Sequence, residues 1–132
     1  MKLHNEHKRF NWHVAKSLKF QCSRTELWNI ISMPSNLELF HPFCAKNPIT
    51  NWPGIGSADT ILYYNDLKLE RNFINWEDKI GYDLLIGKEN GEQSFVSWRI
   101  KEINNTLKLT ISVYPYLNNC GSKLTNFLPF FI

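Results

Sequence analysis

The chain has 132 residues, of which 43% are hydrophobic and 20% are charged, and these values predict one globular domain over residues 1–132 and exclude a disordered chain. The net charge of +3 comes from scattered lysines and arginines without a basic stripe, so we expect no nucleic-acid partner. No stretch approaches the ~20 apolar residues of a membrane span, so we expect no stable membrane insertion.

The N-terminus has no apolar run that would indicate a signal peptide, and we expect residues 1–10 to be a flexible tail. Cys22, Cys44 and Cys120 make an odd count without C-x-x-C spacing. Such cysteines are typical of reduced thiols in a cytoplasmic protein, which is the location we expect.

Residues 12–21 alternate between apolar and polar side chains, and a period of two predicts a strand. Lys16 interrupts the pattern because it falls on the apolar side with Val14, Leu18 and Phe20. We expect its long side chain to be exposed or to extend to the rim of the apolar face.

Two short helices are expected next. Ser23 and Glu26 have the spacing of a capping box, which predicts a helix start at Ser23, and Pro34 predicts its end near Ser32. Ser35 can cap a second turn over residues 36–40.

The rest of the chain to residue 116 predicts consecutive short strands separated by turns. Asn65-Asp66 and Asn90-Gly91 fit two-residue hairpins because Asn and Gly tolerate positive φ, and residues 104–105 mark another turn. The strands are expected over residues 58–64, 68–76, 82–87, 94–103 and 107–116.

Apolar residues alternate cleanly along the later strands, which is typical of an antiparallel meander with one buried face. The first strand most simply rejoins the sheet beside the last one. We therefore expect an α+β fold in which a curved antiparallel sheet of six or seven strands closes around two short helices.

This order resembles the START, polyketide-cyclase and birch-pollen-allergen superfamily, also called helix-grip or SRPBCC, and in particular its functionally undefined bacterial members. The resemblance covers about residues 12–116. It rests on Ser23-Arg24-Thr25-Glu26-Leu27-Trp28, Leu39-Phe40-His41-Pro42, Trp52-Pro53-Gly54-Ile55-Gly56-Ser57, Leu69-Glu70-Arg71-Asn72-Phe73 and Gly81-Tyr82-Asp83-Leu84.

The resemblance implies a seven-stranded sheet that grips a long C-terminal helix over a deep apolar cavity. Members bind lipids, sterols, hormones or polyketides, and some cyclise or dehydrate their ligand. A grip helix needs ~20 residues at 1.5 Å each, whereas residues 122–132 are few and contain Pro129. We therefore expect this helix to be absent or rudimentary.

Three possible functions follow from this resemblance and from the expected lack of a full grip helix. The first is binding of a small apolar ligand, such as a lipid or polyketide, between sheet and helices. The second is a cyclase or dehydratase activity in the same cavity; the sequence leaves open whether the protein is an enzyme. The third is an interaction module or truncated family member, in which a homodimer covers the open sheet.

Arg71 alternates with apolar neighbours and is expected to point inward, although a register with Ile74 and Trp76 inward is also open. A buried guanidinium needs a carboxylate partner or a ligand anion, and Asp59 or Glu70 could be that partner. The ligand-binding candidates are Trp28, Arg71, Phe73, Tyr82 and Trp98.

His41 ends the second helical turn and is the candidate general acid or base at the cavity mouth. Its alternative is a loop histidine before a proline. His41 and Cys44 form an H-x-x-C pair, but nothing in the spacing demands zinc, so we expect no metal and no cofactor.

Overall fold

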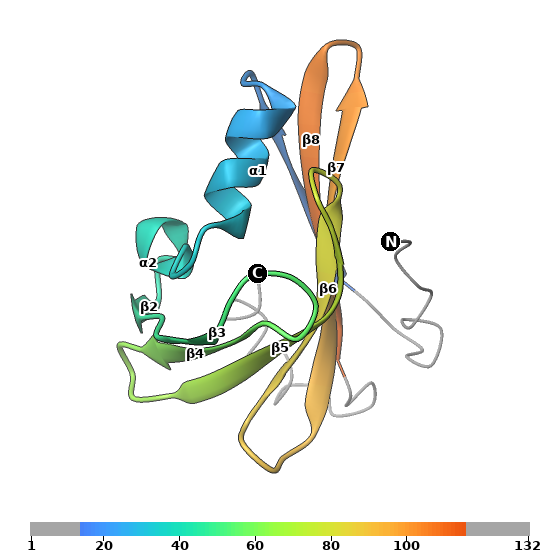
Figure 1. Ribbon diagram of the computed structural model, residues 1–132. Coiled ribbons are helices and arrows are strands. Elements are labelled where there is room, and N and C mark those ends of the chain that lie inside the picture. Colours follow the sequence, from blue (N-terminus) through green and yellow to red (C-terminus); the bar gives the residue numbers. More distant parts are fainter. Residues whose placement is uncertain (1–13, 116–132) are drawn as a thin grey trace.

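A single antiparallel sheet curls around two short helices that lie on its concave side (Figure 1). The computed structural model describes residues 14–115. The predicted flexible tail and the predicted rudimentary grip helix (122–132) lie outside these residues. In chain order the elements are β1 (Val14–Phe20), α1 (Arg24–Ser32), α2 (Leu37–Phe40), β2 (Cys44–Lys46), β3 (Ile49–Asn51), β4 (Ala58–Tyr63), β5 (Lys68–Glu77), β6 (Gly81–Gly87), β7 (Gln93–Ile103) and β8 (Thr106–Tyr114).

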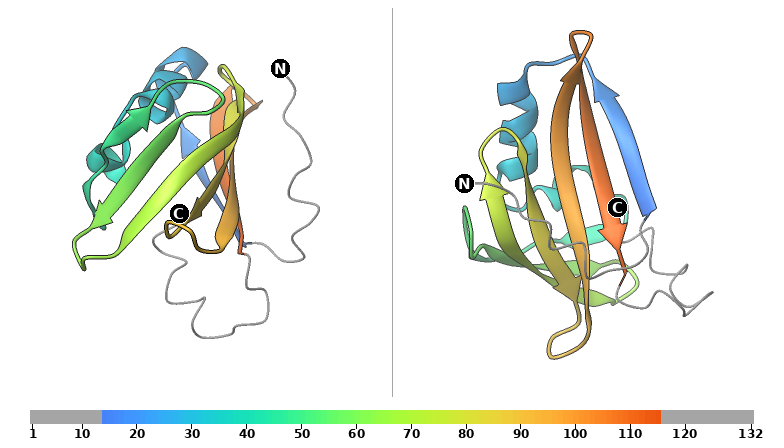
Figure 2. Two further views of the ribbon diagram at one scale, coloured as in Figure 1. Left: turned by 60° about the horizontal axis from the view of Figure 1, so that its bottom comes forward. Right: turned by 90° about the vertical axis from the view of Figure 1, so that its right-hand side faces the viewer.

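The strand order confirms that the first strand returns beside the last. The sheet runs β1-β8-β7-β6-β5-β4-β2, with β3 pairing β4 beside this path. β1 and β8 are antiparallel, with Val14 opposite Val113 and Phe20 opposite Leu107, and they lie side by side at one edge (Figure 2). The predicted α+β architecture of a curved sheet with two short helices is thus confirmed, and β2 and β3 are additional short strands.

A two-residue hairpin turn is present, but not at either of the two positions where the sequence predicts one. β7 and β8 are joined by Asn104 and Asn105, both with positive φ (52° and 63°), as a two-residue turn between twisted strands requires. The turns over residues 64–67 and 88–92 are longer, although Asp66 and Asn90 adopt positive φ within them.

α1 begins and ends where the sequence predicts. The Ser23 hydroxyl accepts a hydrogen bond from the backbone N–H of Glu26 at 3.1 Å and donates one to its carboxylate at 3.0 Å. Such an N-cap satisfies a backbone donor that the helix cannot satisfy itself. The helix ends at Ser32, and it buries Leu27, Trp28 and Ile31 against the sheet.

The prediction that Ser35 caps the second helix is wrong. The cap position of α2 is Asn36, and its side chain makes no capping hydrogen bond. Ser35 instead donates to the backbone carbonyl of Asn47 at 2.7 Å, and this bond ties the α1–α2 connection to the loop between β2 and β3.

A β-bulge in β5 combines parts of the two inward registers that the sequence leaves open, although Ile74 is only half-buried. Pairing with β6 shifts between Phe73 and Asn75, because a bulge adds one residue to one strand. Arg71 and Phe73 are therefore buried before the bulge and Trp76 after it. Both ends of β5 supply side chains to the concave face.

Candidate ligand-binding site

A cavity of about 390 Å³ lies between the β1–β8–β7 edge of the sheet and the two helices. Figure 1 shows α1 and α2 on the concave side of the sheet. We refer to this part of the concave face as the open half; it is lined by Lys16, Leu18, Phe20, Cys22, Leu27, Ile30, Ile31, Leu37, Phe40, His41, Pro42, Trp98, Leu109 and Ile111.

The strand wall of the cavity follows from the pairing of β1 with β8. Leu18 lies opposite Leu109, and Lys16 opposite Ile111. Because side chains of paired strands alternate between faces together, these residues all project from the concave face. Trp98 continues the wall from β7, since Ile111 is also its partner.

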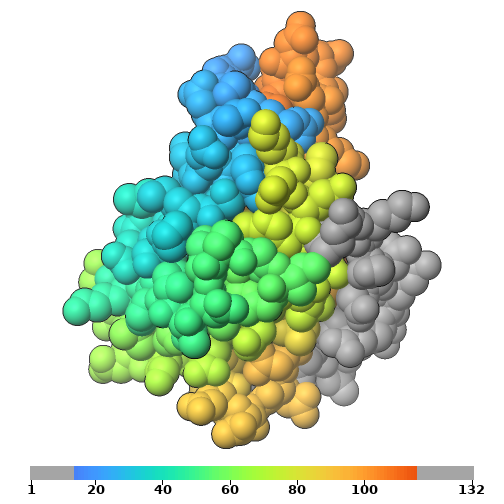
Figure 3. Space-filling view, in the orientation of Figure 1, coloured from blue at the N-terminus to red at the C-terminus, as the bar shows by residue number. Residues whose placement is uncertain are grey.

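Part of this apolar wall is open to solvent. Leu18 is 44% exposed, Ile30 47% and Phe40 42%, whereas Ile31 behind them is 2% exposed. The exposed residues come from β1, α1 and α2 and all line the same cavity. In the space-filling view, α1 and α2 form one side of the molecule, and the β7–β8 hairpin lies beside the N-terminal end of α1 (Figure 3). The open half therefore has a buried floor and an apolar mouth.

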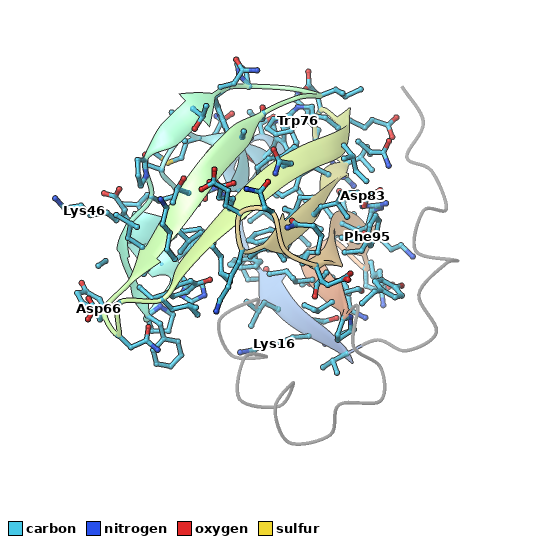
Figure 4. All side chains as sticks on the ribbon, turned by 90° about the horizontal axis from the view of Figure 1, so that it is seen from below. Lys16, Lys46, Asp66, Trp76, Asp83 and Phe95 are labelled. Atoms are coloured by element: carbon cyan, nitrogen blue, oxygen red, sulfur yellow. The ribbon has the colours of Figure 1, made fainter. Side chains whose placement is uncertain are left out.

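Four of the described cavity-lining side chains carry groups that can form polar interactions, namely Lys16, Cys22, His41 and Trp98. Lys16 extends from β1 on the concave side of the sheet (Figure 4). Within residues 14–115 the ion pairs are Arg71–Asp59 and Arg99–Asp83, neither of which involves Lys16.

His41 follows α2, is largely buried and lines the cavity. Its Nδ1 accepts a hydrogen bond from the backbone N–H of Phe43 at 3.2 Å, so the neutral imidazole carries its proton on Nε2. The ring also packs edge-on near Tyr63, with centroids 5.8 Å apart. His41 therefore lines the cavity, while its position at the mouth and its acid–base role stay predictions.

The other half of the concave face is built around a buried ion pair. Arg71 Nε donates to Asp59 Oδ1 at 2.8 Å, and its Nη2 donates to Asp59 Oδ2 at 2.5 Å. Burial alone would lower the pKa of Arg71, but the Asp59 carboxylate outweighs burial and raises this pKa above its ordinary value. Of the two partners considered, the structure selects Asp59, opposite Arg71 on β4.

Tyr82 connects this half to the end of α1. Its hydroxyl donates to the backbone carbonyl of Ile31 at 2.8 Å, and the Asn36 side-chain amide donates to the same carbonyl. Burial raises the pKa of Tyr82 well above its ordinary value. These hydrogen bonds satisfy a carbonyl that the last turn of the helix would otherwise leave unpaired.

Aromatic rings fill the space around the ion pair. The ring centroids of Trp28, Phe73, Trp76 and Tyr82 lie 5.0 to 6.2 Å from their neighbours. The Arg71 guanidinium lies over the Phe73 ring at 4.9 Å, a favourable cation–π arrangement. We refer to Asp59, Arg71 and these four rings as the filled half.

The structure thus separates the predicted ligand-binding residues. Trp98 lines the cavity, with its ring near Phe40 (6.2 Å) and near Tyr82 (5.3 Å), so it lies where the two halves meet. The other four predicted residues belong to the filled half, and their contact with a ligand stays a prediction.

Sequence reasoning did not select Lys16, Leu18, Leu109 and Ile111 as site residues. The signal was present, because the predicted β1–β8 pairing and the alternation in both strands already put these residues on one face. The missing information was which part of that face α1 and α2 leave open.

The described residues do not favour a metal site or a membrane helix. Within residues 14–115, no group of three His, Cys, Asp or Glu side chains is placed to share a metal ion. None of the helices described here is long and apolar enough to cross a membrane.

Comparisons in sequence give no match, either to a protein-family model or to a curated protein. Solved structures do match. The Aha1 dimer from Colwellia psychrerythraea has a TM-score of 0.67 at 8% identity, over 88% of this chain and 84% of that chain. Major latex-like protein 151 from Panax ginseng has a TM-score of 0.65 at 10% identity, over 89% of this chain and 91% of that chain.

Ara h 8.0201 matches with a TM-score of 0.60 at 12% identity, over 77% of this chain and 75% of that chain. Identities this low establish a shared fold without a shared ligand or reaction. The chain therefore has a fold of the helix-grip (SRPBCC) type.

Proposed function

We propose that this protein binds a small apolar ligand, such as a lipid or a polyketide, in the cavity of the open half. The observation that carries the proposal is a cavity of about 390 Å³ with an almost wholly apolar lining. Ligand pockets in proteins typically enclose about 300–1,000 Å³ and combine apolar walls with a few polar groups.

The exposed side chains of the mouth support the same proposal. Leu18, Ile30 and Phe40 leave apolar surface in contact with water. Removing such surface from water stabilises a complex by about 25 cal/mol per Å². A ligand that reaches from the buried floor to the mouth would cover all three side chains, so its binding energy would come mainly from apolar contact.

The direct test is binding of N-phenyl-1-naphthylamine, a neutral fluorophore that brightens in apolar sites. We expect saturable binding that Leu18→Trp weakens at least about tenfold, because an indole at the mouth occupies the space of the ligand. Lys19→Trp is the matched control, since residue 19 neighbours Leu18 on β1 but faces the convex side. Absence of saturable binding, or equal weakening by both variants, would contradict the proposal.

A homodimer is the second candidate, because exposed apolar residues continue beyond the cavity around α2. Leu39 and Phe43 are exposed together with Phe40, and one structure of similar fold is described as a dimer. A second copy that packs on α2 would cover this surface. Light scattering across a wide concentration range tests the dimer, and a constant monomer mass would exclude it.

The cyclase or dehydratase alternative has weaker support. His41 lines the cavity, but Arg71, a second charged group that could serve such chemistry, is held by both oxygens of Asp59. Binding is therefore the function that the geometry supports best.

A further inference from the structure

Lys16 contributes a permanent positive charge to a cavity that is otherwise almost wholly apolar. It stands on β1 between Val14 and Leu18 in the alternating pattern and pairs across the sheet with Ile111. Its place in the cavity lining means that this charge belongs to the site and not to the convex surface.

Among residues 14–115, no side chain that lines the cavity carries a counter-charge. None of these lining residues is Asp or Glu, and the ion pairs of the same residues join Arg71 to Asp59 and Arg99 to Asp83. A lysine beside apolar surface with no carboxylate partner attracts an anion, and the attraction strengthens as a ligand displaces water from around it.

The position of Lys16 also indicates which part of a ligand it would contact. β1 forms the edge of the sheet, and Lys16 itself is exposed although it lines the cavity. A lysine in such a place lays its methylene stem along apolar neighbours and keeps its ammonium at the water boundary. An apolar ligand in the cavity would thus meet the charge at its solvent-facing end.

On the basis of the proposed function, we infer that the ligand is an anionic amphiphile, with its apolar part in the open half and its carboxylate bound by Lys16. This assignment distinguishes Lys16 from the rest of the lining. The apolar walls set the affinity for any apolar molecule, whereas Lys16 selects among molecules of equal apolar size by the charge of their head group.

A structural role for Lys16 gives a different expectation. A charge that points inward on an edge strand discourages edge-to-edge association of sheets. In that role Lys16 would affect solubility and leave the choice of ligand unchanged. The two roles are therefore separated by a measurement of ligand preference.

The experiment compares laurate with lauryl alcohol, which share an alkyl chain and differ in head-group charge. Each displaces N-phenyl-1-naphthylamine from the full-length protein near neutral pH. We expect laurate to bind about threefold to tenfold more tightly than lauryl alcohol, in the range of a partly exposed charge pair. Added salt should reduce this preference.

Four variants test the assignment. Lys16→Met and Lys16→Gln should remove the preference for laurate over lauryl alcohol, and Lys16→Gln serves if the methionine variant associates. Lys16→Arg keeps the positive charge and should keep the preference. Lys19→Met removes the same charge from the opposite face of β1 and should have no effect.

Each contrary result has a specific meaning. Binding of laurate and lauryl alcohol with equal affinity would overturn the role of Lys16 and leave the proposed function standing. An unchanged preference in both neutral variants would do the same and would favour edge protection. Failure of the wild-type protein to bind the fluorophore, laurate or lauryl alcohol would overturn the inference together with the proposed function.

Discussion

The two halves of the concave face differ in what occupies the space between the sheet and the helices. In the filled half, aromatic rings pack within 5.0 to 6.2 Å of each other around the Arg71–Asp59 pair. In the open half, leucine, isoleucine and phenylalanine side chains surround a cavity of about 390 Å³. Protein interiors are normally packed like organic crystals, so the contrast places the packed core in the first half and the proposed ligand site in the second.

The connections between the halves explain how the open half keeps its shape. Tyr82, from the filled half, donates to the carbonyl of Ile31, whose side chain lines the cavity. Trp98 lies within ring contact of Tyr82 on one side and of Phe40 on the other. α1 is thus anchored to the filled half while its other apolar residues border the cavity, so the cavity wall does not depend on a ligand for its position.

The largest effect should come from breaking the buried ion pair of the filled half. Asp59→Leu leaves the Arg71 guanidinium buried without a partner, and we expect a loss of about 3–5 kcal/mol in the free energy of unfolding. The double variant Asp59→Leu/Arg71→Met should recover most of this loss. Urea unfolding measures the free energy of unfolding of the single and the double variant.

Glu70→Gln is the matched control for that experiment, because Glu70 adjoins Arg71 on β5 and makes no ion pair within residues 14–115. It should cost less than about 1 kcal/mol. Equal losses for Asp59→Leu and Glu70→Gln would mean that the pair does not stabilise the filled half.

A leucine beside the filled half and a leucine of the open half give the next largest contrast. Leu84 on β6 pairs with Phe73 across the sheet and is 1% exposed, whereas Leu18 on β1 is 44% exposed. We expect Leu84→Ala to cost about 2–5 kcal/mol, because it leaves a void in a packed core. Leu18→Ala should cost less than about 1 kcal/mol. Similar costs would show that the open half is covered in solution.

Alkaline pH should weaken the filled half. The pKa of Tyr82 is raised by burial, so the native state retains a proton that the unfolded chain releases above about pH 10. The free energy of unfolding should therefore fall with rising pH by about 1.4 kcal/mol per pH unit for this tyrosine. Below pH 10 its contribution is fully present.

Tyr82→Phe tests this prediction through the slope of the free energy of unfolding against pH. Urea unfolding across the alkaline range should show a shallower fall for Tyr82→Phe than for the wild-type protein. Tyr64→Phe controls for the loss of a tyrosine hydroxyl at an exposed position. Parallel slopes for the wild type and Tyr82→Phe would remove Tyr82 as the source of alkaline instability.

The filled half was largely predictable from the sequence, since it depends on regular alternation and on simple charge pairing. One of the two registers read from the period-two pattern puts Arg71 inward, and the cost of an unpaired buried charge predicts a partner for it. The choice of Asp59 over Glu70 came from the structure. The capping box of Ser23 and Glu26 is equally local. Local rules were enough wherever a residue's surroundings are set by its own strand or helix.

The features that could not be predicted from the sequence depend on where distant elements meet. β2 and β3 have three residues each, too few to show a period, and the bulge beside Phe73 changes the alternation without a distinct residue signal. The cavity depends on how far α1 stands from β1, a distance set by the packing of Trp28 and Tyr82 in the other half. No single segment contains that information.

The smallest effect on stability should come from the helix wall of the cavity, where two adjacent isoleucines differ sharply. Ile30 is 47% exposed and Ile31 2% exposed, and both line the cavity. We expect Ile30→Gln to change the free energy of unfolding by no more than about 0.5 kcal/mol, since it replaces an exposed side chain in a helix. It should nevertheless weaken binding of N-phenyl-1-naphthylamine, because it removes apolar surface from the mouth. A loss of stability as large as that of Ile31→Gln would show that something covers Ile30 in solution, and a fall in mass by light scattering in the same variant would identify the cover as a second copy of the chain.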